Sequence, residues 1–202
     1  MKIAVINEMS AWQKNKVIVD ALEKLGHEVL NVGMSEEYNE VQLTYIHTGF
    51  IAGTVLNLGL ADMVIGGCGT GQGFLISSMQ FPGVFSGLLL EPVDAFLFSQ
   101  INAGNCVSLA LNKGYGWAGE LNLANIFEKL LENKPGLGYP PERSESQCNS
   151  RRLLKNMSTA AHKRFEDIVA SMDAEVIETA LQHPPFRALI TSADYGVFTK
   201  YL

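Results

Sequence analysis

Short β-rich runs alternate with longer segments of helical periodicity from the start of this chain to about residue 132. The alternation predicts strands at residues 2–6, 28–32, 62–67, 86–90 and 105–110. It predicts helices at residues 12–25, 43–58, 73–79, 92–101 and 118–132. Strict alternation with short connections favours parallel strands, because each crossover helix returns the chain to the same end of the sheet. We therefore predict an α/β fold with a doubly wound, three-layer, Rossmann-like arrangement around a five-stranded parallel sheet.

The chain changes character after residue 135. Prolines and glycines crowd the segment that follows, which predicts a linker over residues 136–150. Helical spacing returns in residues 151–172 and 175–182. With 202 residues, the chain is long enough for one α/β domain and an appendage. We expect an α/β domain at 1–135 and a helical C-terminal extension at 151–202, packed on the core or on a partner subunit.

The composition indicates a globular protein. Hydrophobic residues make up 47% of the chain and charged residues 18%, which is too apolar for disorder. No apolar run is long enough for a membrane span, and the first strand, which Glu8 follows, is too short for the core of a signal peptide. We therefore expect a cytoplasmic protein with no membrane partner. A net charge of −6 argues against a nucleic-acid partner, because binding a phosphate backbone needs a concentrated basic face.

The residues that bind metals elsewhere are scattered in this sequence. The three cysteines lack C-x-x-C spacing and form no ligand pair with the four histidines, so we predict no metal, no disulfide framework and no cofactor. The arginines, in contrast, all lie in the last third of the chain: Arg143, Arg151, Arg152, Arg164 and Arg187. Any bidentate grip on a phosphate or carboxylate must come from that part.

Ligands of doubly wound sheets bind at the carboxyl ends of the strands. The loops after the first, third and fourth strands are therefore the ones to search. Glu8 follows the first strand, where we predict that it acts as a second base or as an acceptor for a substrate hydroxyl; a solvated loop carboxylate is the alternative.

A glycine-rich loop follows the third strand directly. Gly69, Gly71 and Gly73 alternate there, which lets successive backbone N–H groups point into one concavity at a helix start and bind an anion. Cys68 and Thr70 place a thiol and a hydroxyl on the same turn. The loop lacks the lysine of a P-loop and does not follow the first strand, so a nucleotide site is disfavoured. A tight turn beside an inert buried cysteine is the plainer interpretation.

The same groups suit an aldose–ketose isomerase. That reaction needs a base to move a proton between two carbons and needs donors to stabilise an enediolate. Backbone amides serve the second need, and a thiolate whose pKa is lowered serves the first.

In sequence the chain resembles the family of ribose-5-phosphate isomerase B and the galactose-6-phosphate isomerase subunits over roughly residues 1–152. The resemblance rests on Lys2-Ile3-Ala4, Leu25-Gly26-His27-Glu28-Val29, Tyr45, Cys68-Gly69-Thr70-Gly71, Glu91-Pro92, Gln100, Asn102, Asn105 and a late segment with arginine, in family order. It implies a sugar isomerase that works without a metal through a cis-enediol or enediolate intermediate. It also implies a homodimer or homotetramer with shared active sites.

The resemblance assigns roles to particular residues. It implies that Cys68 is the base, that Thr70 opens the ring or orients the substrate, and that the amides of Gly69, Gly71, Gln72 and Gly73 hold the enediolate. It further implies that the substrate-binding residues include Tyr45, Asn102 and an arginine from the neighbouring chain, for which Arg151 and Arg152 stand nearest. Turn formation is an alternative role for Asn102, and a solvated basic face is an alternative role for the two arginines.

Departures from the family pattern affect the substrate. Met9 and Ile101 stand where the family has histidines, and His47 could replace one of them or could simply lie on a helix surface. Because isoleucine cannot transfer a proton, an open-chain substrate or one with a carboxylate is favoured. Our specific prediction is a 4-deoxy-hexosulose uronate. The alternatives are a pentose or hexose phosphate isomerase and a catalytically silent protein that binds a sugar or sugar phosphate.

Overall fold

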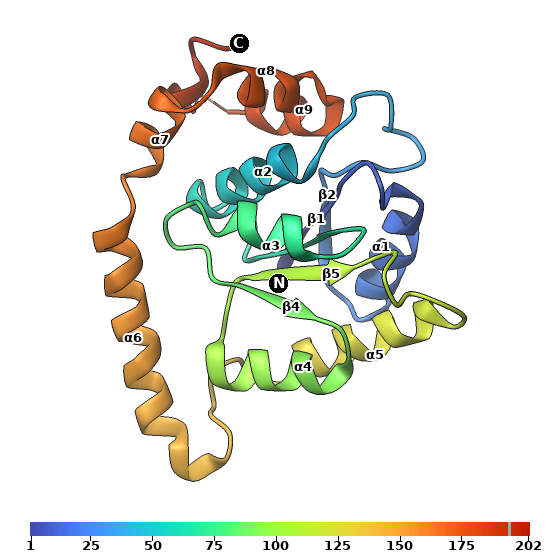
Figure 1. The fold of residues 1–202 in the computed structure, drawn as a ribbon, viewed down its shortest axis with the longest axis vertical. Helices are drawn as coiled ribbons and strands as arrows, with labels where there is room; N and C mark the ends of the chain where they lie inside the picture. The colour runs from blue at the N-terminus through green and yellow to red at the C-terminus, as the bar shows by residue number, and fades with distance from the viewer. Residues whose placement is uncertain (194) are drawn as a thin grey trace.

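The computed structural model describes residues 1–193 and 195–202 (Figure 1). In chain order the elements, with η for 3-10 or π-helical segments, are β1 (Lys2–Asn7), η1 (Trp12–Lys14), α1 (Asn15–Lys24), β2 (Glu28–Asn31), α2 (Tyr45–Asn57), β3 (Met63–Cys68), α3 (Gln72–Ser78), β4 (Ser86–Leu89), α4 (Pro92–Leu97), η2 (Phe98–Asn102), β5 (Cys106–Ala110), α5 (Gly119–Leu131), η3 (Pro141–Arg143), α6 (Ser144–Ala161), α7 (Phe165–Ser171), α8 (Ala174–Gln182), α9 (Pro184–Thr191) and η4 (Gly196–Phe198). Through α5, every predicted strand and helix is present, with small differences at the ends.

Within the described residues, the strands form one five-stranded sheet in the order β2-β1-β3-β5-β4. Every neighbouring pair is parallel. The winding direction reverses between β1 and β3, because β2 lies on one side of β1 and the later strands lie on the other. The doubly wound fold is therefore confirmed, and its carboxyl-end crevice lies between the loops that follow Asn7 and Cys68.

Alternate side chains of the strands enter two hydrophobic clusters. On β1, Ala4 and Ile6 join the cluster that includes α2 residues, while Ile3 and Val5 join the cluster that includes α1 and α5 residues. All of these β1 side chains are fully buried. Figure 1 shows α2 and α3 on one side of the sheet and α4 and α5 on the other. The result is the predicted three-layer arrangement, with apolar residues on both faces of the sheet.

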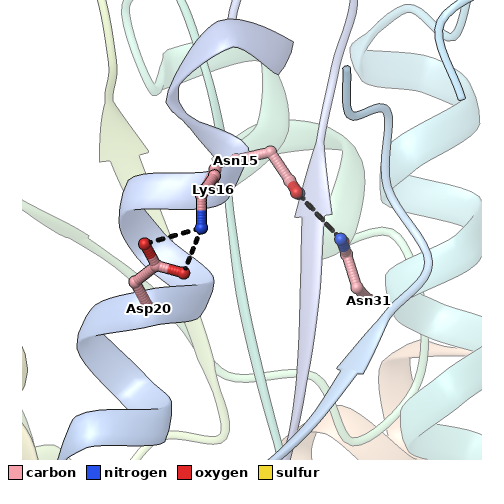
Figure 2. Close-up of polar contacts among 4 residues, drawn as sticks. All are labelled: Asn15, Lys16, Asp20 and Asn31. Carbon is pink, nitrogen blue, oxygen red and sulfur yellow. Dashed lines mark hydrogen bonds and ion pairs between the residues drawn. The ribbon is translucent and has the colours of Figure 1, made fainter. Parts of the chain in front are cut away.

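Three asparagines join the carboxyl ends of β1 and β2 to the start of α1. The Asn15 amide donates to Oδ1 of Asn7 (3.0 Å) and of Asn31 (2.9 Å), and Asn31 donates back to Asn15 Oδ1 (2.8 Å; Figure 2). Lys16 and Asp20 pair one turn apart on the exposed side of α1. Because buried amides need partners, this network fixes the backbone that leads from β1 to Glu8.

The linker predicted at 136–150 ends earlier than expected. A 3-10 turn begins at Pro141, and α6 begins at Ser144 rather than at Arg151. Proline is suited to a first helical turn, where no N–H donor is needed, and residues 144–150 contain neither proline nor glycine, so their polar character did not prevent a helix. The described part of the chain has no helix both long and apolar enough to cross a bilayer.

The C-terminal extension packs on the core of its own chain. Figure 1 shows α8 and α9 outside α2, so that α2 lies between them and the sheet. The Phe50 ring of α2 meets Phe186 of α9 and Phe198 of η4 edge-on, with centroids 6.0 and 6.2 Å apart. These three rings are fully buried. One hydrophobic cluster therefore spans the sheet layer and the extension.

Candidate active site

The loop after β3 is shaped by a glycine at which any other residue would be strained. Cys68 is the last residue of β3, and α3 begins at Gln72. Gly71 lies between them in the left-handed region, with φ of +76°, and a Cβ there would collide with the side chain of Leu88. Its carbonyl accepts a hydrogen bond from Ser108 Oγ at 2.5 Å. The turn is therefore fixed in position on β5 as well as on its own strand.

Cys68 and Thr70 lie on the same turn, as predicted. Cys68 is 7% exposed, and its Sγ lies 3.9 Å from Thr70 Oγ1. Thr70 itself is exposed. Cys68 thus packs in a hydrophobic cluster, while its thiol also lies near the hydroxyl of an exposed residue.

The amides of this loop are largely available. The Gln72 amide donates to Thr70 Oγ1 (3.3 Å), and the Leu75 amide donates to the Gly71 carbonyl (3.1 Å). Among the residues that the structure describes, the amides of Gly69, Thr70, Gly71 and Gly73 have no hydrogen-bond acceptor. They are the donors that an oxyanion would use.

The first peptide of the loop is oriented by the segment after β5. The Gly69 carbonyl accepts from the amides of Asn112 (3.0 Å) and Lys113 (2.8 Å). Because the C=O and N–H of one trans peptide point in opposite directions, the Thr70 amide is turned away from that segment. The two hydrogen bonds to the Gly69 carbonyl therefore fix the direction in which the free Thr70 amide points.

Tyr45 and Ser10 border the loop on two sides. The Tyr45 ring lies over Gly73, where a Cβ would come within 2.7 Å of the ring carbon Cγ. Ser10 lies over Gly69 in the same way, with its Oγ 3.0 Å from the position of a Cβ. Both glycines thus provide space for a neighbouring side chain, and Tyr45 lies beside the loop, while its contact with substrate stays a prediction.

Glu8 is held beside this loop by its neighbour in sequence. It is 5% exposed, and its Oε1 accepts hydrogen bonds from the amide of Ser10 (3.0 Å) and from the Ser10 hydroxyl. Its own amide donates to the Gly67 carbonyl (3.4 Å) on β3. The carboxylate predicted at the end of the first strand therefore lies at the carboxyl-end crevice.

Ser10 and Asn112 were not predicted as site residues. Asn112 Nδ2 donates to the Ser10 carbonyl (2.8 Å), and Asn112 Oδ1 accepts from Lys14 Nζ (3.0 Å). The sheet order, which the sequence does not show, places β5 rather than β4 beside β3 and so brings the loop after β5 next to the Cys68 loop. That the loop after the fourth strand borders the site stays a prediction.

His47 is used as a helix cap. Its Nδ1 accepts from the Thr44 amide (3.0 Å) and lies 3.1 Å from Thr44 Oγ1 at the start of α2. Partial burial lowers the pKa of His47. The contact of His47 with substrate stays a prediction, as does that of Gln72, which is exposed at the start of α3.

Asn102, Arg151 and Arg152 lie at the other end of the sheet. Asn102 precedes β5 and lines a groove of about 440 Å³ with residues of β4 and α6. Arg151 donates to the carbonyls of Ile101 (2.8 Å) and Gly136 (2.9 Å), and Arg152 donates to Asn149 Oδ1 (2.8 Å). The length of β5, on the order of 13 Å at 3.3 Å per residue, separates this group from the Cys68 loop. A single chain therefore does not bring all the predicted site residues together.

Fold and loop together define a class: a doubly wound α/β protein with free backbone amides beside a thiol at the carboxyl end of a central strand. Residues 3–136 match the model of the Ribose/Galactose Isomerase family, and the chain belongs to this family. The predicted resemblance is thus confirmed.

Similar solved structures agree with this assignment. The crystal structure of a 4-deoxy-L-threo-5-hexosulose-uronate ketol-isomerase complexed with a tartrate is 37% identical, covers 100% of this chain and 97% of its own, and has a TM-score of 0.92. The ribose-5-phosphate isomerase from Vibrio parahaemolyticus is 43% identical, with the same coverage and TM-score. The ribose 5-phosphate isomerase of Thermotoga maritima, at 24% identity, covers 72% of this chain and 96% of its own with a TM-score of 0.60, and shares the fold. The chain is therefore a sugar isomerase, as the sequence predicted.

Proposed function

We propose that this chain isomerises a 4-deoxy-hexosulose uronate between its aldose and ketose forms, with Cys68 as the base. The observation that carries this proposal is the loop after β3. Its thiol lies 3.9 Å from the Thr70 hydroxyl, beside four amides with no acceptor in the described residues. The similarity to a ketol-isomerase of this uronate over the full chain supports the choice of substrate.

In the proposed reaction, the Cys68 thiolate takes the proton from the carbon next to the carbonyl. The electron pair of that C–H bond forms the enediolate double bond, and the negative charge moves onto the former carbonyl oxygen, where the free amides stabilise it. The thiol then returns the proton to the former carbonyl carbon. Glu8 moves the hydroxyl proton from one substrate oxygen to the other. No atom is gained or lost overall.

The residues around the loop support an open-chain, anionic substrate. Met9 stands beside Glu8 where the family pattern has a histidine, and a thioether cannot transfer the proton that opening a sugar ring requires. Lys14, bonded to Asn112 Oδ1, places a positive charge near Gly69. A carboxylate-bearing sugar that is already linear fits both features.

A substrate panel tests this proposal. We expect the uronate to give a kcat/KM at least about tenfold above those of ribose 5-phosphate and galactose 6-phosphate, because the two sugar phosphates must first be ring-opened, and a missing acid–base group costs such a step about 10²-fold or more. Carbonyl migration is followed by NMR in deuterated water, which also reports exchange at the carbon beside the carbonyl. A C68S variant serves as the inactive control.

The other outcomes are equally informative. Faster turnover of ribose 5-phosphate or galactose 6-phosphate would replace the uronate with a sugar phosphate as substrate. A lack of deuterium incorporation with every sugar, together with measurable binding, would show a silent binding protein.

We further propose a homodimer or homotetramer with shared active sites. Asn102 and Arg152 lie too far from Cys68 to act on the same substrate within one chain, so they would serve a neighbour. The exposed apolar side chains of α6, which include Leu153, Leu154 and Met157 at 47%, 46% and 65% exposure, support a contact there.

Mixing two inactive variants tests the shared site. In a mixed dimer of C68S and R152A chains, one site carries both defects and the other carries neither. If chains exchange at random, about a quarter of wild-type activity should return when the variants are refolded together. R164A, whose arginine pairs with Asp167 on α7, is the matched control for the arginine change and should keep activity alone. No recovery on mixing would place the site within one chain.

The free cysteines support a cytoplasmic location, which is also proposed. Cys68, Cys106 and Cys148 are unpaired thiols in the described structure. A reducing compartment keeps such thiols intact, including the proposed base.

A further inference from the structure

His183 lies in the C-terminal extension, between α8 and α9, and is fully buried. Its Nε2 lies 3.1 Å from the carbonyl oxygen of Gly33. Since a carbonyl can only accept, the ring proton lies on Nε2. In the described part of the chain, Nδ1 has no partner, and burial lowers the pKa of His183. The ring is thus a neutral donor aimed at one backbone oxygen.

The peptide that receives this hydrogen bond also contacts β1. The amide of Met34, in the same peptide as the Gly33 carbonyl, donates to the Asn7 carbonyl (2.9 Å). Gly33 packs against the backbone of Ile6 and Asn7 so closely that a Cβ would not fit. One peptide plane therefore connects the extension to the residue that precedes Glu8.

The far end of the same loop holds the residue that follows Glu8. The Met9 amide donates to the Leu43 carbonyl (2.8 Å). The loop at residues 33–44 thus donates a hydrogen bond to Asn7 and accepts one from Met9, the residues on either side of Glu8. The loop then leads into α2, whose first residue, Tyr45, lies over Gly73. The position of two predicted site residues depends on how this one loop is held.

The C-terminal extension is well packed around His183. Phe186 and Ile190 of α9 are fully buried in the cluster that contains Phe50. The Tyr38 ring, within the loop, meets the His183 ring edge-on at 6.4 Å. Well-packed side chains hold a donor in one rotamer, which is what an aligned hydrogen bond to a loop requires.

We propose that His183 is a positioning residue, which acts through the Gly33–Met34 peptide to hold Glu8 and Tyr45 beside the Cys68 loop. The C-terminal extension would then serve catalysis as well as stability. The inference rests on the proposed roles of Glu8 and Tyr45.

Three variants separate positioning from stability. H183F keeps an aromatic ring but removes the donor, and H183Q keeps an N–H at a similar reach. I190V removes one methylene from α9, the helix that follows His183, and leaves the hydrogen bond to Gly33 in place, so it is the stability control. We expect kcat of H183F to fall about tenfold with a smaller change in KM, because small misplacements of reacting groups are costly. H183Q should recover most of that loss, and I190V should keep wild-type kcat at a comparable Tm.

A second measurement does not depend on the substrate. Hydrogen exchange of the amides in residues 33–44 should be faster in H183F than in I190V, and E8Q should lower kcat by less in H183F than in the wild type. Equal exchange in the two variants, or equal kcat losses at equal Tm, would overturn the proposal. If the wild type turns over no sugar but H183F still frees the loop, the proposed function fails while the structural contact stands.

Discussion

Replacing Cys68 by serine should lower kcat by about 10³-fold and leave the fold intact. A serine hydroxyl ionises far less readily than a thiol, so the variant keeps the shape of the loop but loses the base. The free amides and Thr70 remain, so substrate binding should change less than turnover. Steady-state kinetics measure kcat and KM, and circular dichroism with a thermal melt checks the fold.

The other cysteines provide controls for this result. Cys148 is exposed on α6, and C148S should keep wild-type kcat. Burial raises the pKa of Cys106 to about 11, so this thiol should resist alkylation at pH 8 in the folded protein. Turnover of C68S within a few-fold of the wild type would remove Cys68 from the role of base.

Replacing Phe50 by alanine should lower the free energy of unfolding by about 3–5 kcal/mol. Its ring is fully buried and meets Phe81, Phe186 and Phe198 at centroid distances of 6.1, 6.0 and 6.2 Å. Denaturant unfolding, followed by fluorescence, measures the change in stability.

The same experiment shows whether the extension is a separate domain. Phe50 belongs to one hydrophobic cluster that contains residues of both α9 and the strands. We therefore expect a single unfolding transition for the wild type and for F50A. F96A is the matched control, since Phe96 is half-buried with one aromatic neighbour, Tyr139, and should cost less. Two separate transitions, of which F50A shifts only one, would contradict a common core.

The sequence predicted the fold through α5 because each strand and helix there has its own local signal. The period of apolar residues changes from strand to helix, and glycines or prolines mark the ends. The sequence did not show which strands become neighbours, since that depends on contacts between distant segments. The start of α6 was missed for another reason: residues 144–150 are polar, and polar residues are common both in linkers and on exposed helices.

The site was predicted as far as it lies on one continuous segment. The segment Cys68–Gly73 carries its chemistry in its own sequence, and Glu8 is placed by the end of a strand. Ser10 and Asn112 meet only through folding, and neither has a pattern that marks it. Arg151 was predicted as a substrate-binding residue, but its guanidinium donates to two carbonyls of its own chain. Nothing in the sequence indicates these hydrogen bonds.

Helix α2 has apolar neighbours on both sides, and its sequence is correspondingly apolar all round. Every residue from Thr48 to Val55 is buried, so the helix has no solvent-facing stripe. A shorter family member without α8 and α9 would expose the outer half of the equivalent helix to water, and selection should place polar residues there. The polarity of the second helix should therefore distinguish long members from short ones by sequence alone. Deleting the extension from a long member should cause aggregation unless that half of the helix is made polar as well.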